Sequence, residues 1–558
     1  MASAAAITLA IPEIAQLVIN LLDDRETLQA TSRVCKLWSA LSIPRIWHGS
    51  LHKLSANLDS SRHPSYLFNE CLQQPSLCYL WYMWQRPHSE RLFELLSHIQ
   101  FFENWWDHRR FQADGGSSYQ RCKCEKELIS SEAFRYLKPK AMRLHLGWDS
   151  RMASGPSYFR FFTENLRYVA LLNAGHTSKM IKTLSEQCPQ LRCLQHTGGD
   201  IDGYDPNVWA RHLPSLTALT HLYLGDKWQT TKDTSHVACA LAEMPKLKAL
   251  TLCNDLNVDR FASSSQDIKD PFPSLQALSL QWVGIEMFKA FAPHLSKLQT
   301  IHLSLRSSPS GKRKIGPEIF SFPDLRELSI TQPWSDLEHP EEEIDLLFSE
   351  LQQLSSTCPL MRFIIIKPYG SFADYFGRQV RPQVSPEPKL HEVLAPWPFL
   401  EQFKVDGPFV WFIDNEEDLS NMAANNKYLV DLSIPNDVDL LDLGNLPDDV
   451  VFPCLNWFCI HKFEYPKGAV NLPYEKILDK HMPALRDIRV MLRANPKDGR
   501  TRGRWNRIEK HCRKRGDPYG HRESLLDRYT NFSKDEYENL LMDIAGEPRS
   551  GKASFSWM

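Results

Sequence analysis

One sequence phrase recurs through most of this 558-residue chain and limits what it can fold into. From Leu166 onward the pattern Pro-x-Leu-x-x-Leu-x-Leu returns with aliphatic or aromatic substitutes, as in Pro245–Leu252 and Pro273–Leu280. Successive copies lie 23 to 39 residues apart, and several are 28 apart, so one supersecondary unit is repeated along the chain. The first apolar residue of each copy is Leu166, Leu191, Leu219, Leu247, Leu275, Leu298, Leu325, Met361, Leu400, Leu429, Leu455 or Leu485.

Each copy predicts a short strand followed by a helix. Leu-x-Leu alternation is typical of a strand with one buried face, and apolar segments such as 179–184, 237–241, 287–291 and 344–348 follow it. A Cys-Pro, Met-Pro or Phe-Pro pair then ends the helix, because the residue before a proline avoids helical backbone. No unit of this length buries its apolar face alone, so neighbouring units are expected to stack as a solenoid.

The residues inside each Leu-x-Leu are predicted to share the opposite, concave face of that solenoid. They are Tyr223, Thr251, Ser279, His302, Ser329, Lys404, Cys459 and Arg489. The row has no consistent charge, and solenoids offer long shallow surfaces rather than closed pockets. We therefore expect an unidentified protein target there, with Tyr223, His302, Lys404 and Arg489 as candidate contact residues.

A doubly wound α/β domain is the alternative, since it also alternates strand and helix. Such domains usually carry Gly-rich phosphate-binding turns and variable spacing, and neither is seen in this sequence. The repeats resemble leucine-rich repeats, particularly the degenerate, proline-punctuated kind common in fungi. They lack the strict Asn of the regular repeat, so the resemblance implies an irregular arc or a horseshoe.

Residues 11–47 form a second informative segment, with more apolar side chains than so short a piece can bury. Pro12 favours a helix start, and Glu13 suits the positive end of the helix dipole. Apolar residues recur at helical spacing over 14–22 and again over 28–41. Segments below about 40 residues rarely build a sufficient core alone. The predicted three helices therefore leave an apolar surface for a partner protein.

This segment resembles an F-box. The residues that carry the resemblance are Ile11-Pro12, Glu13-Ile14, Val18-Ile19, Leu22-Asp23-Asp24, Val34-Cys35-Lys36-Leu37-Trp38 and Ile46-Trp47. The chain departs from the family pattern by having Ile for the usual Leu and by lacking one residue between Pro12 and Glu13. The alternative is an ordinary three-helix cap on a larger domain.

F-box proteins recruit substrates to a cullin-based ubiquitin ligase by docking a Skp-type adaptor. The resemblance therefore implies an adaptor and a cullin as partners. Adaptor docking, by direct contact or by holding the helices together, is assigned to Pro12, Ile14, Val18, Ile19, Leu22, Val34, Cys35, Trp38 and Trp47.

The expected fold class is α plus α/β, a small three-helix F-box followed by a leucine-rich-repeat solenoid. Its parts are the F-box at 8–50, a helical linker or N-terminal cap at 51–135, the repeats at 136–492, and a basic segment with a helical tail at 493–558. The tryptophans of 51–135 favour a cap over the first repeat, with a partner-binding hot spot as the alternative.

The basic segment 493–515 carries ten Lys and Arg against two acidic residues. It is open to three interpretations: a nucleic-acid site with Trp505 interleaved, a nuclear-import address at 513–515, and a solvated loop after the last repeat. The solvated loop is favoured, so nucleic acid is not expected as the main partner.

Motifs for chemistry are missing from the sequence. It has no phosphate-binding loop, no nucleophile elbow and no His-Glu-x-x-His pair, so we expect a chain that is not an enzyme and holds no cofactor. Cys122 and Cys124 have no second pair for a zinc site. Thirteen scattered cysteines favour a reducing compartment, and no apolar run is long enough to cross a bilayer. We expect a cytoplasmic or nuclear protein without a membrane partner.

The sequence thus predicts a substrate-recognition subunit of an SCF-type ubiquitin ligase, whose partners carry out the ubiquitin chemistry. The alternative is a leucine-rich-repeat scaffold, or a nucleic-acid-binding protein that uses the basic segment, without a role in a ligase.

Overall fold

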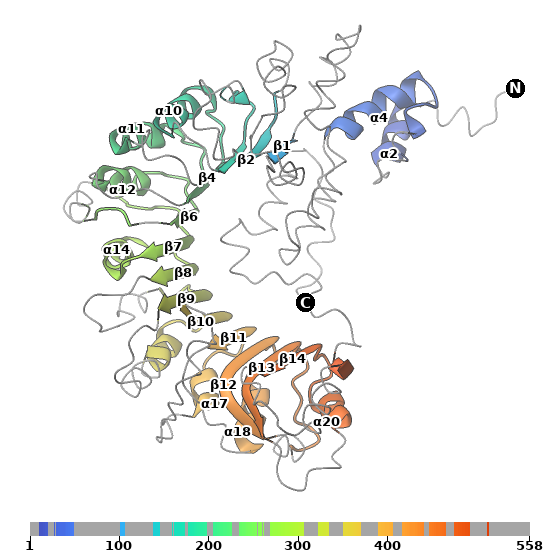
Figure 1. Cartoon of the computed structure of the whole chain (residues 1–558), viewed down its shortest axis with the longest axis vertical. Coiled ribbons are helices and arrows are strands. Elements are labelled where there is room, and N and C mark those ends of the chain that lie inside the picture. The colour runs from blue at the N-terminus through green and yellow to red at the C-terminus, as the bar shows by residue number, and fades with distance from the viewer. Residues whose placement is uncertain are drawn as a thin grey trace, which may run out of the picture. The chain divides into compact units, whose positions relative to one another are not determined.

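The computed structural model describes residues 11–20, 27, 30–48, 101–105, 138–145, 159, 161–172, 177–197, 205–225, 234–253, 255–258, 261, 268–305, 322–333, 350–369, 389–405, 416–439, 446–464, 474–490 and 510–512 (Figure 1). The chain divides into two compact units, the first ending at Leu247 and the second beginning at Lys248. Each unit is built from parallel strands with helices between them.

A strand begins within every predicted copy of the repeat. From β3 to β14, the strand starts two residues after the first apolar residue of its copy, as Tyr168 follows Leu166 and Asp487 follows Leu485. The first unit holds β1 (Phe101–Trp105), β2 (Ala141–His145), β3 (Tyr168–Leu172), β4 (Cys193–Thr197) and β5 (His221–Leu224). The second holds β6 (Ala249–Leu252), β7 (Ala277–Val283), β8 (Thr300–Leu305), β9 (Glu327–Pro333), β10 (Phe363–Tyr369), β11 (Gln402–Val405), β12 (Asp431–Asp439), β13 (Trp457–Glu464) and β14 (Asp487–Val490).

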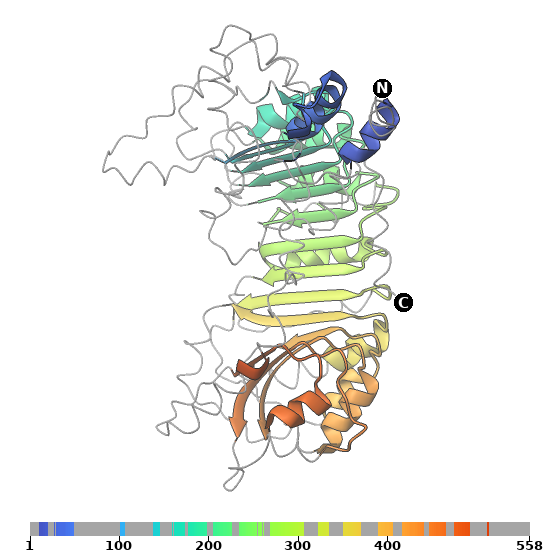
Figure 2. The ribbon, with the colours of Figure 1, turned by 90° about the vertical axis from the view of Figure 1, so that its right-hand side faces the viewer.

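Within each unit, consecutive strands are hydrogen-bonded neighbours and run parallel. Figure 2 shows them as arrows that lie side by side and point the same way. A parallel pair needs a crossover that returns the chain to the same edge. The segment after each strand supplies that crossover, which is why the repeat alternates strand and helix.

The strand register aligns the residues predicted to lie inside each Leu-x-Leu. We call this line of residues the polar row. In the second unit, the residues paired across consecutive strands are Thr251, Ser279, His302, Ser329, Ile365, Lys404, Ser433, Cys459 and Arg489. In the first unit, Tyr223 is paired with Gln195 of β4. The structure thus confirms that the predicted residues share one face of the sheet within each unit. It adds Gln195, Ile365 and Ser433 to them.

The opposite face of the sheet is apolar and buried. Its register line in the second unit consists of Leu250, Leu278, Ile301, Leu328, Ile364, Phe403, Leu432, Phe458 and Ile488, each at most 3% exposed. Because side chains alternate between the two faces of a strand, a shift by one residue would exchange this core for the polar row. The Leu-x-Leu pattern therefore fixes the register.

Tight turns connect each helix to the next strand. The backbone N–H of Leu191 donates to the carbonyl of Cys188, and that of Leu400 donates to Trp397, over 3.0 and 3.1 Å. Proline follows Cys188 and Trp397, and its fixed φ suits the first central position of such a turn. The prediction that these X-Pro pairs return the chain to the next strand is confirmed. In the turns that lead directly into a strand, the buried residues that precede proline are Cys188, Met244, Phe272, Phe322, Cys358, Trp397, Phe452 and Met482.

Helices cover one face of the strands in each unit (Figure 1). The first unit has α10 (Thr177–Gln187), α11 (Pro206–His212), the 3-10 helix η7 (Leu213–Ser215) and α12 (Ser235–Ala242). The second has α14 (Ile285–Phe291), η9 (Ala292–His294), α17 (Leu390–Leu394), α18 (Glu416–Asn425) and α20 (Tyr474–His481). The helices expected at 179–184, 237–241 and 287–291 are confirmed as parts of α10, α12 and α14. The one expected at 344–348 lies outside the described residues.

Side chains in the turns link consecutive repeats of the second unit. Cys358 Sγ donates to the carbonyl of Phe322 at 3.3 Å, and Trp397 Nε1 donates to the carbonyl of Cys358 at 3.0 Å. Asn426 Nδ2 then donates to the carbonyls of Trp397 and Leu394 at 3.0 and 3.1 Å. All of these bonds are buried. We call the series Phe322, Cys358, Trp397 and Asn426 the turn relay.

The N-terminal segment contains α2 (Pro12–Asn20) and α4 (Lys36–His48), which contact each other. The apolar set expected over 28–41 is divided by a turn at 32–34, where the N–H of Val34 donates to the carbonyl of Thr31. A strand, β1, lies inside the range expected to be a helical linker or cap, because the aromatic residues of 101–105 pair in register with β2.

Candidate interaction surfaces

The N-terminal helices present apolar side chains to solvent. Leu17 and Val34 are 65% and 66% exposed, and Ile11 is 42% exposed. Ala15 and Ile19 on the same α2 helix are fully buried, so α2 has one packed face and one open face. This is the apolar surplus that the sequence predicted, carried in part by Ile11 and Leu17.

The structure separates the predicted adaptor-docking residues by exposure. Pro12, Val34 and Cys35 are exposed, Ile14, Val18 and Trp38 are half-buried, and Ile19 is buried. Leu22 and the side chain of Trp47 lie outside the described residues. Leu17 was not among the predicted contacts, although its position between Ile14 and Val18 in the same apolar set could have indicated it.

The polar row of the strands is more enclosed than an open concave face would be. Tyr223 and Lys404 are half-buried, whereas His302 is only 5% exposed. The side chain of Arg489 lies outside the described residues. Contact of these residues with a target stays a prediction, and in this structure Tyr223 and Lys404 are the more accessible of the described three.

Lys404 lies in a compact polar cluster on β11, β12 and β13. Its Nζ is 3.4 Å from Asp431 Oδ2 and 4.5 Å from the centre of the Trp457 ring. Gln402 Nε2 donates to the same Asp431 oxygen at 2.7 Å. An ammonium over an indole ring and beside a carboxylate has both an electrostatic and a π partner. The lysine is therefore held in place and is not a freely moving surface charge.

His302 lies in the polar row between Ser279 and Ser329. Burial lowers the pKa of its imidazole to about 4, because the charged form loses its hydration. At neutral pH His302 is thus an uncharged side chain. It cannot supply positive charge to a partner under those conditions.

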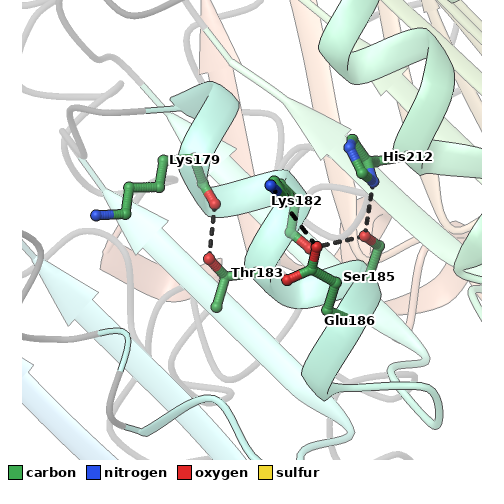
Figure 3. A network of polar contacts seen from close by, with 6 residues as sticks. All are labelled: Lys179, Lys182, Thr183, Ser185, Glu186 and His212. Carbon is green, nitrogen blue, oxygen red and sulfur yellow. Dashed lines mark hydrogen bonds and ion pairs between the residues drawn. The ribbon is translucent and has the colours of Figure 1, made fainter.

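A network of polar contacts lies on the helices of the first unit (Figure 3). Ser185 Oγ on α10 is 3.0 Å from His212 Nδ1 on α11, and it donates to the carbonyl of Lys182 at 2.7 Å. A serine whose proton goes to a backbone carbonyl is not being deprotonated by the histidine. The Ser185–His212 pair therefore links two helices and does not resemble an activated nucleophile.

The described residues show neither a cluster of metal ligands nor a membrane-spanning helix. In the described residues, no three His, Cys, Asp or Glu side chains gather as a metal site would require. Of the helices that the structure describes, none is both long enough and apolar enough to cross a bilayer. The Cys122 and Cys124 pair and most of the basic segment lie outside the described residues.

Comparison with known proteins shows only distant likeness. No protein-family model matches the chain, and no curated protein matches it. One similar solved structure is the complex of Rad7 and Elc1 in yeast, with 12% identity and a TM-score of 0.36, covering 77% of this chain and 93% of that one. Another is the mouse RP105/MD-1 complex, with 13% identity and a TM-score of 0.26, covering 64% and 72%. Similarity at this level does not place the chain in a family.

Proposed function

We propose that this chain is the substrate-recognition subunit of a cullin-based, SCF-type ubiquitin ligase. Its N-terminal helices dock a Skp-type adaptor, and its repeats bind a protein target. The ubiquitin chemistry belongs to the other subunits of the ligase, so the chain itself needs no catalytic group or cofactor.

One observation carries this proposal. Leu17, Val34 and Ile11 expose apolar surface on a short helical segment that also bears the F-box-like residues. Three exposed large apolar side chains within so short a segment exceed the scattered single residues of an ordinary protein surface. A folded protein partner would bury them.

The exposure pattern suggests how the predicted residues divide their roles. Pro12, Val34 and Cys35 are open to solvent and available for direct contact, while Ile19 is buried and holds the helices together. Ile14, Val18 and Trp38 lie between these extremes, at the border where a docking partner would complete their burial.

The experiment is co-purification of the full chain with a recombinant Skp-type adaptor. Leu17→Asp combined with Val34→Asp should abolish capture, because each change puts a charge into an apolar contact without altering a buried side chain. Phe399→Asp, at another exposed large apolar residue far along the sequence, is the control and should capture normally. Undiminished capture by the double variant, with unchanged circular dichroism, would refute the proposed docking surface.

A further inference from the structure

A row of exposed apolar side chains lies on the turns of the second unit. Leu360, Phe399 and Tyr428 are 39%, 53% and 55% exposed. Each directly precedes the first apolar residue of its repeat, so the three occupy the same position in consecutive turns before β10, β11 and β12. We call them the turn row. Among the described residues, the other exposed large apolar side chains are those of the N-terminal segment.

Neighbouring contacts hold the turn row in a fixed arrangement. The rings of Phe399 and Tyr428 stack, with centroids 6.1 Å apart and planes inclined by 28°. Beside them, the N–H of Glu401 donates to the carbonyl of Arg362, and the N–H of Val430 donates to the carbonyl of Glu401. These backbone hydrogen bonds fix the spacing of the turns. Exposed Pro359 and Pro398 precede Leu360 and Phe399 and add rigid apolar area. The turn relay anchors the same turns from the inside.

The exposed area of the turn row limits what can bind there. Two half-exposed aromatic side chains and one leucine offer roughly 300 Å². A stable dimer buries about 800 Å² on each partner, so a second copy of this chain would need much more surface than this. Neighbouring strands are about 4.8 Å apart, and three turns therefore span roughly 10 Å, which three or four residues of an extended peptide cover.

Charge around the row indicates what else the peptide carries. Carboxylates of this region already have cations: Glu401 Oε1 accepts from Arg362 Nε at 2.9 Å, and Asp431 pairs with Lys404. On the β9 side, exposed Asp324 and Arg326 offset each other. Toward β14, the charged residues directly beside the first apolar residue of a repeat are Lys427 and Arg486, both exposed. The turn before β13 also exposes Asp448 and Asp449, and Asp448 is paired with Lys480. At the positions directly beside the turn row, the unpaired excess charge of the described residues is therefore positive.

We propose that the turn row binds an extended peptide segment of another protein. An apolar anchor of the peptide covers Leu360, Phe399 and Tyr428, and acidic residues next to the anchor face Lys427 and Arg486. Phe399 and Tyr428 stack on each other, and Leu360 and the prolines offer no π surface. The row therefore suits an aliphatic or aromatic side chain better than a stack of nucleic-acid bases. The inference does not depend on adaptor docking.

The test starts from a display library of random nine-residue peptides selected on the full chain. Enriched sequences should carry large apolar residues with Asp or Glu within a few positions. Synthetic peptides from that selection are then measured by fluorescence anisotropy. Phe399→Ser with Tyr428→Ser should weaken their binding by about tenfold or more, since hot-spot aromatic residues dominate such contacts. Lys427→Glu should weaken it several-fold and flatten its salt dependence.

Controls separate this surface from the other sites. Lys246→Glu changes an exposed lysine in an earlier turn and should leave peptide binding unchanged. The Phe399, Tyr428 double variant should still capture the Skp-type adaptor, so failure here would leave adaptor docking untouched. The inference is overturned if the selected peptides lack acidic residues or bind the double variant equally well. Two further outcomes would overturn it. One is that the wild-type chain binds a uridine 12-mer and the double variant does not; the other is that the wild-type chain self-associates, as measured by light scattering, and the double variant does not.

Discussion

The indole N–H of Trp397 donates a buried hydrogen bond of 3.0 Å to the backbone carbonyl of Cys358, 39 residues earlier in the chain. This bond joins two consecutive turns, and Asn426 repeats the arrangement one turn later. In each case a side chain donates to a carbonyl that also accepts the backbone N–H closing its own turn. The turn relay thus connects consecutive repeats through three different residue types.

Trp397→Phe should destabilise the second unit. The carbonyl of Cys358 loses its shorter hydrogen bond and keeps only the 3.4 Å bond from the N–H of Met361, and the smaller phenyl ring leaves a cavity at a fully buried position. Together these effects cost about 1–3 kcal/mol. Hydrogen exchange measured by mass spectrometry should show faster exchange in β10 and β11. Tyr428→Phe, a change at an exposed aromatic residue of the next turn, is the control. A Trp397→Phe protein with wild-type protection would contradict the relay.

The pair of Lys404 and Asp431 should show measurable coupling. Both side chains are about 15% exposed. The interaction free energy of this ion pair should therefore lie between that of a fully buried pair and that of a surface pair. We expect Lys404→Met to destabilise the protein by about 1–2 kcal/mol and a double-mutant cycle with Asp431→Asn to give about 1 kcal/mol of coupling. Urea denaturation followed by tryptophan fluorescence measures both, and strictly additive effects would mean that the contact contributes nothing.

Stability should fall in mild acid because of His302. Its pKa is about 4 in the folded protein and near 6.5 when exposed in the unfolded chain. The unfolded state therefore binds more protons between these values, so stability is lost as pH falls from about 6.5 to about 4. His302→Gln should reduce this slope, while His236→Gln, at an exposed position, should not. Equal slopes for all three proteins in thermal melts would show that His302 is not enclosed.

Cysteine reactivity should follow burial. Burial raises the pKa of the Cys188 thiol to about 12 and also raises the pKa of Cys358, so both are protonated at pH 8. Cys35 and Cys454 are exposed. Brief treatment of the native protein with iodoacetamide should label Cys35 and Cys454 and spare the other two, as read by peptide mass spectrometry. Rapid labelling of Cys188 would mean that its turn is not packed as described.

Alanine at both Pro12 and Ile14 should weaken adaptor capture and leave the repeats folded. Pro12 is exposed at the start of α2, and Ile14 is half-buried at the edge of the open face. Pull-down with the recombinant adaptor measures the loss, and far-ultraviolet circular dichroism monitors the fold. Capture at the wild-type level would remove these two residues from the docking surface.

The strands and turns could be predicted from the sequence because the residue pattern that produces them is repeated at regular intervals. Leu-x-Leu and the X-Pro pair impose the same local physics at Leu191 and at Leu485, so one rule serves every repeat. The turn relay could not be predicted, because its donors at Cys358, Trp397 and Asn426 share no chemistry. The turn row was missed for a related reason. Leu360, Phe399 and Tyr428 occupy a position that the repeat pattern leaves variable, and only their exposure makes them significant.

The constant two-residue step from the first apolar residue to the strand has a further consequence. Copies that begin 23 residues apart and copies that begin 39 apart enter the sheet in the same way, so extra length is absorbed between one strand and the next turn. Such a framework accepts insertions in a single repeat without transmitting the change to its neighbours. New binding loops can therefore arise in this protein one repeat at a time, while the rest of the sheet keeps its alignment.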